Sequence, residues 1–168
     1  MENKQNVNPQ KNTIKRILLK ACTFLIIISI LLMFIYGIAI IKNDNMFPSI
    51  YKGDICVFTR VEPYSLEDVI IYKQNNEIHI GRIMAINGQT VDFQNEFMTI
   101  DNAIPLEQLP IKTFQAKDSN IQFPITLKQN EFFILNDNRE NTEDSRQYGI
   151  INKKDIKGKV EYILRGEM

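Results

Sequence analysis

The sequence predicts a mostly β domain that follows a single N-terminal membrane-spanning helix. An uncharged, apolar run, Ala21–Ile41, lies near the N-terminus. From residue 55 onwards, short apolar runs alternate with turn-forming residues and show no strong helical periodicity. Strands at this spacing are typical of an all-β or mostly β, barrel-like domain. A chain of 168 residues has room for one such domain beside its anchor.

The predicted transmembrane anchor covers residues 17–41. Its 21 uncharged residues, Ala21–Ile41, would form a helix about 32 Å long, which is enough to cross a bilayer. A cleaved signal peptide would have a shorter apolar core that ends at small residues. Here the apolar run continues past Gly37-Ile38-Ala39, so we expect a retained anchor.

Charge predicts how the chain is oriented. Residues 1–20 carry five basic residues and one acidic residue, whereas residues 42–168 carry 15 basic and 19 acidic residues. The positive-inside rule then places a tail, residues 1–16, in the cytoplasm and the domain, residues 42–168, outside the cell. Residues 2–14 are rich in Asn, Gln and Lys, which is typical of disorder. An acidic domain without a basic cluster in its sequence argues against a nucleic-acid partner.

The two cysteines do not predict a disulfide. Cys22 lies in the anchor and Cys56 lies in a predicted strand, so their thiols cannot meet. The simplest interpretation of Cys56 is a small apolar core residue.

The domain reads as a series of strands and turns. Turns are expected at Lys52-Gly53-Asp54, at residues 62–65 and 74–77, and at Asn87-Gly88. Strands are expected at residues 55–58, 69–72, 78–84, 90–93, 97–100, 131–135, 150–152 and 158–164. The strands 90–93 and 97–100 would pair across Asn87-Gly88. Residues 101–129 contain three prolines and are expected to form an insert over the sheet or a small subdomain.

Four segments, in order, resemble the type I signal peptidases, a family of serine/lysine proteases. They are Asn45-Met46-Phe47-Pro48-Ser49 with Gly53-Asp54, Asp68-Val69-Ile70-Ile71-Tyr72, Gly81-Arg82-Ile83-Met84-Ala85-Ile86-Asn87-Gly88, and residues 137–146 with Gly149 and Gly158-Lys159. The last segment is the most specific, because it fixes many residue types over about twenty positions. The resemblance implies a signal peptidase-like β-fold after one anchor.

Both catalytic positions of the family differ in this chain. The family's nucleophilic serine aligns with Asn45, and its general-base lysine aligns with Gly81. In a serine/lysine mechanism a neutral lysine takes the proton of the hydroxyl, so losing both groups removes the side-chain route to an acyl-enzyme. We therefore expect no catalytic residues at these positions and no cofactor, and a non-catalytic role is favoured over an enzymatic one.

The rest of the family pattern persists as structural positions. The resemblance places Thr142 where a hydroxyl supports the lysine, and Asp144 and Arg146 at paired-charge positions. We expect an ion pair between Asp144 and Arg146 that holds the loop. The structural positions implied by the resemblance are Gly53, Asp54, Arg82, Asp137, Arg139, Thr142, Asp144, Ser145 and Arg146.

Residues other than those at the two catalytic positions offer an alternative, an active signal peptidase that removes signal peptides as a serine endopeptidase with non-standard residues. Its candidates are Ser49, with Lys52 or Lys73 as the base. His79 is the only histidine, but the alternation Ile78-His79-Ile80 indicates a solvent-facing strand residue. No metal-ligand spacing occurs, since residues 137–142 lack the Asp or Asn at the third position and the Gly at the sixth that an EF-hand loop requires.

A peptidase cleft binds an extended chain along a strand edge, and this needs no nucleophile. The expected edges are strand 68–72 and the backbone around Asn43–Phe47. The candidate groove residues are Asp44, Asn45, Met46, Phe47, Pro48, Val69, Ile70, Ile71 and Gly81. Some Gram-positive signal peptidase homologues without the Ser/Lys pair serve sortase-dependent pilus assembly, and this chain is similar to them. The resemblance implies an accessory or chaperone-like role at the cell surface, with a pilin subunit and a pilus sortase as partners beside the membrane.

Overall fold

The computed structural model describes residues 9–105, 111–117, 119 and 121–166. The chain divides into two compact units, residues 1–36 and residues 37–168. The elements, in chain order, are α1 Pro9–Ile35, β1 Tyr36–Ile40, β2 Ile55–Thr59, β3 Val69–Gln74, β4 Glu77–Ala85, β5 Thr90–Gln94, β6 Phe97–Ile100, β7 Ile125–Thr126, β8 Glu131–Leu135, α2 Ser145–Tyr148, β9 Ile151–Asn152, η1 Lys153–Asp155 and β10 Ile156–Leu164. The fold is mostly β, as the sequence predicts.

The N-terminal unit is the apolar helix α1. Its segment Thr13–Ile35 has 23 residues with a mean hydropathy of 2.7, long and apolar enough to cross a membrane. The helix begins at Pro9, a residue favoured in a first helical turn. Residues 9–14 are therefore helical, which corrects the expected disorder of residues 2–14 for that part, and residues 1–8 lie outside the described residues.

The end of the predicted anchor is also corrected. The expected span reached residue 41, but the helix ends at Ile35 and Tyr36–Ile40 form strand β1. Gly37 has low helix propensity, and the exposure of β1 alternates along the strand. A β-carbon on Gly37 would stand 2.2 Å from Cζ of Phe58, so a larger residue there would force the Phe58 ring to move.

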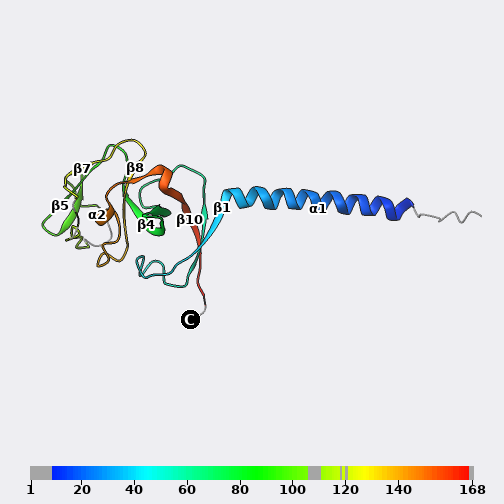
Figure 1. Ribbon diagram of the computed structural model, residues 1–168, viewed down its shortest axis with the longest axis horizontal. Helices are drawn as coiled ribbons and strands as arrows, with labels where there is room; N and C mark the ends of the chain where they lie inside the picture. The colour runs from blue at the N-terminus through cyan, green and yellow to red at the C-terminus, as the bar shows by residue number, and fades with distance from the viewer. Residues whose placement is uncertain (1–8, 106–110, 118, 120, 167–168) are drawn as a thin grey trace, which may run out of the picture. The chain divides into compact units, whose positions relative to one another are not determined.

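The C-terminal unit contains two antiparallel sheets (Figure 1). The larger has the order β1-β2-β10-β3-β4-β8-β9, and the smaller has the order β6-β5-β7. Strand β10, the last in the sequence, lies between β2 and β3. This long-range pairing makes β3 an interior strand.

Most predicted strands are confirmed, but one turn was assigned wrongly. The turn at residues 74–77 joins β3 to β4, with Asn75 and Asn76 at positive φ. Strands β5 and β6 do pair, but across Asn95-Glu96, whose φ angles are 47° and 69°. Asn87-Gly88 instead connects β4 to β5, which belong to different sheets. The dipeptide makes a turn there without forming a hairpin.

Part of the segment 101–129 is built into the smaller sheet. Strand β7 pairs with β5, and the amide of Thr113 donates to the carbonyl of Glu96 at 2.8 Å. Leu127 is buried with residues of β4, β5, β6 and β8 in one apolar cluster. This cluster joins the smaller sheet to the larger one.

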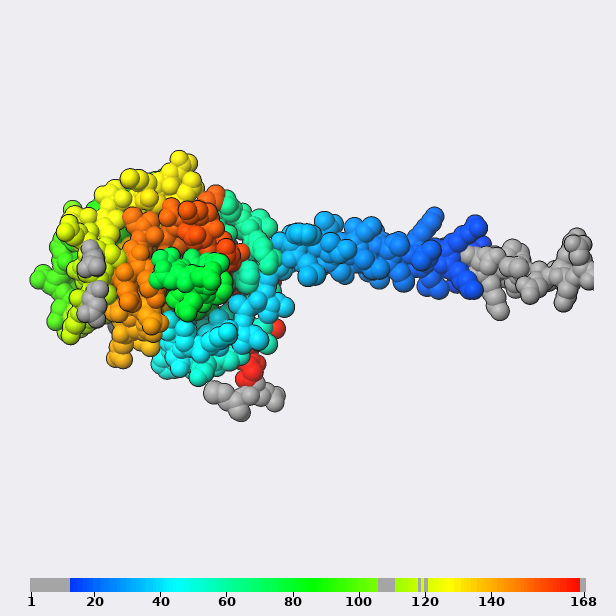
Figure 2. Space-filling model, in the orientation of Figure 1, coloured from blue at the N-terminus to red at the C-terminus, as the bar shows by residue number. Residues whose placement is uncertain are grey.

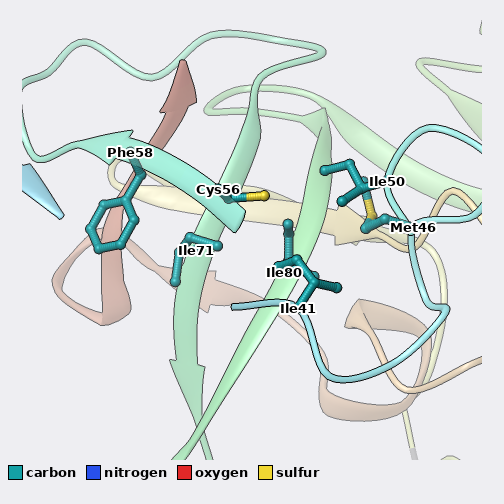
Figure 3. Packing of buried hydrophobic residues seen from close by; sticks show 7 residues of the cluster. All are labelled: Ile41, Met46, Ile50, Cys56, Phe58, Ile71 and Ile80. Carbon is teal, nitrogen blue, oxygen red and sulfur yellow. The ribbon is translucent and has the colours of Figure 1, made fainter. Parts of the chain in front are cut away.

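Two further apolar clusters pack against the larger sheet. One contains Ile41, Met46, Ile50, Cys56, Phe58, Ile71 and Ile80 (Figure 3). The other contains Ile70, Tyr72, Ile83, Phe132, Ile134, Ile151 and Ile156. Neighbouring residues of β3, such as Ile70 and Ile71, contribute to different clusters, because successive side chains of a strand point to opposite faces. The first cluster fixes the segment that carries Asn45, and the second packs around Gly81.

Candidate functional site

Asn45 lies in a turn after β1 and is held by the 137–146 loop. The amide of Asn138 donates to the carbonyl of Asn45 at 2.9 Å. Nδ2 of Asn141 donates to Oδ1 of Asn45 at 2.7 Å, and only 3% of Asn45 is exposed. The residue at the nucleophile position is thus a carboxamide that links two segments and offers no hydroxyl. Asn141 is a partner that sequence reasoning missed, although it lies inside the recognised motif.

The turn that follows keeps this segment in place. The carboxylate of Asp54 accepts the amide of Tyr51 at 2.9 Å, and Gly53 adopts a φ of +96°. The backbone of Ile41 bonds in both directions, donating to Asp54 at 2.9 Å and accepting from Gly53 at 2.8 Å. Gly53 and Asp54 therefore close the loop that positions Asn45. Met46 is fully buried inside it, whereas Phe47 is 48% exposed.

Gly81, at the general-base position, has no room for a side chain. It lies in β4, opposite Ile70 of β3. A β-carbon on Gly81 would stand 2.6 Å from Cγ2 of Ile134 and 3.2 Å from the carbonyl oxygen of Leu135. Non-bonded carbon atoms normally sit 3.5–4.0 Å apart, so even alanine would force a neighbour to move. The side chain of Ile134 fills the space that a lysine side chain at position 81 would need.

Tyr72 borders the same place and cannot replace the lysine as a base. Its Cε1 would lie 3.5 Å from a β-carbon on Gly81, and its side chain is fully buried. The hydroxyl has no hydrogen-bond partner within the described part of the chain. Burial raises the pKa of this hydroxyl far above its usual range, and the nearby Asp144 raises it further. Tyr72 therefore stays protonated.

The loop that frames the site is built on a buried ion pair. Nη2 of Arg146 lies 2.6 Å from Oδ2 of Asp144, and both side chains are fully buried. Arg146 also donates to the carbonyls of Arg139 at 2.7 Å and Asn141 at 2.5 Å. Bidentate pairing of a guanidinium with a carboxylate, plus these carbonyl bonds, compensates for the loss of water. The expected Asp144–Arg146 ion pair is confirmed.

Further bonds tie this loop to the strands. Oγ of Ser145 accepts the amide of Ile134 at 2.9 Å, and Oδ2 of Asp144 accepts the amide of Asn136 at 3.0 Å. Because its amide is anchored in this way, Ile134 is held where it blocks Gly81. The carbonyl of Thr142 accepts the amide of Asp144 at 2.8 Å.

A second ion pair connects β4 to the start of the same loop. Nε and Nη2 of Arg82 lie 2.8 and 2.6 Å from the carboxylate oxygens of Asp137. Nη1 of Arg82 donates to the carbonyl of Glu67 at 2.9 Å. Arg82, which follows Gly81, thus links β4 to the start of the 137–146 loop and to Glu67. Nη2 of Arg139 contacts Sδ of Met84 at 3.7 Å, and its side chain is buried.

The alternative catalytic residues are not brought together. Ser49 is exposed, and its carbonyl accepts a bond from Arg165 at 3.4 Å. Lys52 is exposed as well, and no hydrogen bond between Ser49 and either Lys52 or Lys73 occurs among the described residues.

His79 is not simply solvent-facing as expected, because it stacks on Tyr72 at 5.5 Å and meets the edge of Tyr148 at 5.4 Å. No three His, Cys, Asp or Glu side chains of the described residues lie close enough together to hold a metal.

A groove of about 450 Å³ is lined by the segment around the end of β1, the β3–β4 hairpin and Glu143 of the 137–146 loop. It is lined by Ala39, Ile40, Ile41, Lys42, Asn43, Ile71, Glu77, Ile78, His79, Ile80 and Glu143. In Figure 2 the green hairpin of β3 and β4 lies beside the cyan segment that follows β1 and the orange 137–149 loop. The lining residues Asn43 and Ile80 lie two residues before Asn45 and one residue before Gly81, so each wall leads along the chain to one of the degenerate positions.

The groove places the open strand edge on β4. The expected edge, strand 68–72, is wrong, because Ile70 and Ile71 of β3 pair with β10 on one side and β4 on the other. Strand β4 pairs with β8 only at Arg82–Ala85, whereas its residues Glu77–Gly81 pair with β3 alone among the described strands. The alternation Ile78-His79-Ile80 before Gly81 was the sequence signal for this wall. Of the predicted groove residues, Ile71 lines the groove, whereas Met46 and Ile70 are buried in separate clusters.

The fold and site define a serine/lysine peptidase scaffold from which both the nucleophile and the base are missing. The chain belongs to the signal peptidase family, peptidase S26, whose model matches residues 11–165. It is 31% identical over 134 residues to the "Inactive signal peptidase IA" of Staphylococcus aureus (strain N315), covering 72% of this chain and 74% of that protein. These findings support a catalytically inactive, signal peptidase-like protein with one N-terminal apolar helix, consistent with a single-pass anchor.

Other relatives carry the names of peptidases. Signal peptidase I S of Bacillus subtilis (strain 168) is 23% identical over 173 residues, which cover 95% of this chain and 93% of that protein. A signal peptidase I of known structure, from Enterococcus faecalis V583, is 18% identical, with a TM-score of 0.46 over 60% of this chain and 99% of the other.

Proposed function

We propose that this protein is a membrane-anchored, non-catalytic binding factor that holds an extended segment of a client polypeptide. In our proposal it acts as an accessory or chaperone-like factor in sortase-dependent pilus assembly at the cell surface. Its client is a pilin subunit and its second partner a pilus sortase. The observation that supports the binding step is the groove whose wall is the open edge of β4. This edge is present although the chain lacks the catalytic serine and lysine.

An extended chain fits this groove by strand addition. The free backbone edge of Glu77–Gly81 offers main-chain donors and acceptors, and such edges bind extended peptides in other recognition domains. Ile78 on one wall and Ile40 on the other are 59% and 63% exposed, so they provide apolar contacts for alternate client side chains. Because Asn45 is buried and carries no hydroxyl, the bound chain would meet no nucleophile and would stay uncut.

The pilus role rests on the family resemblance. The chain lacks both the nucleophile and the base but keeps the 137–146 loop. We expect this pattern if selection maintained binding without cleavage. Because a fold does not fix a function, the client needs a direct test.

Photo-crosslinking identifies the client. A photoreactive phenylalanine analogue is placed at Ile78 of the full chain in its native membrane, and a matched variant carries it at Ile104, which is also exposed but lies outside the groove. The proposal predicts a crosslink to pilin from position 78 and none from position 104. Equal crosslinking from both positions would contradict binding in the groove.

Deletion separates binding from the pilus role. We expect loss of polymerised pili when the chain is removed, restored by the wild type and not by Ile78→Asp. Intact pilus polymerisation after deletion would refute the pilus role. If position 78 then crosslinked to another polypeptide, the groove would still be a binding site, but its client would not be pilin.

A further inference from the structure

A second hollow, on a different part of the C-terminal unit, gathers positive charge. It has a volume of about 680 Å³ and is lined by Arg60, Glu62, Tyr64, Asn130, Asn152, Lys153, Lys154, Ile156 and Lys157. These residues come from three separate segments, after β2, before β8 and around η1. Three of its cations come from one lysine-rich stretch, residues 153–157, and the fold adds Arg60 from the segment after β2. We call this cluster the basic hollow.

The charge of the basic hollow is opposite to that of the domain that contains it. Four cationic side chains line it against the single carboxylate of Glu62, a net charge of +3. Residues 42–168 as a whole carry four more acidic than basic residues. Four of their fifteen cations therefore lie around one concavity, which concentrates a positive potential there.

Two of these cations have no counter-charge. Nζ of Lys153 pairs with Oε2 of Glu62 at 2.5 Å. Lys154 and Lys157 form no ion pair with any described residue. Lys154 is exposed and Lys157 is half-buried, and both line the same hollow as Arg60, so their like charges raise the positive potential that an entering anion would meet. The uncompensated charge points to an external anionic ligand.

Apart from Ile156, the neutral residues that line the basic hollow have hydrogen-bonding side chains. Asn130 and Asn152 contribute carboxamides, and Tyr64 contributes a hydroxyl. Burial raises the pKa of this hydroxyl, and Glu62 raises it further, so Tyr64 remains a donor at neutral pH. The guanidinium of Arg60 lies 5.3 Å from the centre of the Phe58 ring, which restrains it at the rim. Cations and neutral donors together match an anion with several oxygens.

We propose that the basic hollow binds a phosphate-bearing ligand, either a soluble phosphodiester compound or the headgroup of an anionic lipid. A phosphate group has more acceptor oxygens and can carry more negative charge than a carboxylate, so it engages more of these cations and donors at once. A hollow of this size lies within the usual range for small-molecule sites and exceeds a single phosphate ion. This ligand is separate from the client of the groove, since the two sites share no lining residue.

Binding is tested on the full chain in nanodiscs of neutral phosphatidylcholine, with inorganic tripolyphosphate as the probe. Calorimetric titration should show saturable binding that weakens by about tenfold or more in Lys154→Gln/Lys157→Gln. The matched control, Lys112→Gln/Lys117→Gln, removes the same charge from exposed residues outside the basic hollow and should bind as the wild type does. No binding, or equal losses in both double variants, would overturn the proposal. Tighter binding of a polyglutamate peptide of equal charge would also overturn it.

Lysine acetylation read by mass spectrometry distinguishes the two sources of phosphate. Protection of Lys154 and Lys157 in nanodiscs that contain phosphatidylglycerol, but not in neutral nanodiscs, identifies a lipid headgroup. Protection by tripolyphosphate alone identifies a soluble ligand. Absence of protection under both conditions would overturn the proposal.

Discussion

Gly81 of β4 and Ile134 of β8 approach so closely that a β-carbon on the glycine would stand 2.6 Å from Cγ2 of the isoleucine. Ile134 is fully buried, and its amide is held by Oγ of Ser145. We therefore expect Gly81→Ala to destabilise the domain by about 1–3 kcal/mol through overpacking. In an Ile134→Ala background the same change should cost less, because Cγ2 is gone. A double-mutant cycle by guanidinium unfolding, followed by tyrosine fluorescence, measures the coupling. Additive effects would contradict the close contact.

The same contact predicts that restoring the two catalytic residues is not sufficient for activity. In Asn45→Ser/Gly81→Lys, the lysine side chain would have to displace Ile134 before reaching the serine. We expect no cleavage of a preprotein whose signal peptide ends in Ala-x-Ala, either by the wild type or by this double variant. Adding Ile134→Ala opens the path for the lysine, so any activity should appear only in the triple variant. Cleavage by the double variant would show that the cleft still accommodates the dyad.

Local patterns predicted most strands and the frame of the site. Runs such as Ile55–Phe58 and Val69–Tyr72 are short, apolar and bounded by turn residues, so their conformation follows from nearby sequence. The Asp144–Arg146 pair was predictable because both members lie inside one motif. The loss of the catalytic pair was also predictable, because Asn45 and Gly81 stand where the family has its serine and its lysine.

Long-range contacts could not be predicted in the same way. Nothing near residue 70 shows that β10, more than eighty residues later, covers the edge of β3. The expected groove edge was therefore wrong, and the open edge belongs to Glu77–Gly81 of β4. The obstruction of Gly81 by Ile134 likewise joins residues far apart in the sequence. The end of α1 at Ile35 depends on β1 pairing with β2, which hydropathy does not report.

Arg146 should be the most sensitive charge in the domain. Arg146→Met leaves the buried carboxylate of Asp144 without its cation, and breaking a buried pair in this way costs about 3–5 kcal/mol. Asp144→Asn/Arg146→Met should recover part of this loss, since a neutral carboxamide still accepts the amide of Asn136. The control is Lys112→Met, which breaks an exposed pair with Glu96 and should cost less than about 1 kcal/mol. Equal losses in the free energy of unfolding would contradict the burial of the Asp144–Arg146 pair.

Neighbouring residues of the first motif should differ sharply in their contribution to stability. Met46 is fully buried among Ile41, Ile50 and Cys56, so Met46→Ala should cost about 2–5 kcal/mol in the free energy of unfolding. Phe47 is 48% exposed and contacts Tyr51 at a ring distance of 5.4 Å, so Phe47→Ala removes much less buried surface. The pair of variants differs by one position and tests the register of the turn. A larger loss from Phe47→Ala would mean that the turn is rotated.

Cys56 predicts how stability depends on alkaline pH. Burial raises the pKa of its thiol to about 11, and the carboxylate of Asp54 contributes in the same direction. The unfolded chain ionises this thiol near its ordinary pKa of about 9, whereas the folded chain keeps it protonated. The stabilising contribution is therefore complete below pH 9 and is lost as the pH rises towards 11. Cys56→Val removes the titrating group, so its free energy of unfolding should fall less steeply than that of the wild type over this interval. Parallel slopes for the two proteins would mean that the thiol is solvated in the folded state.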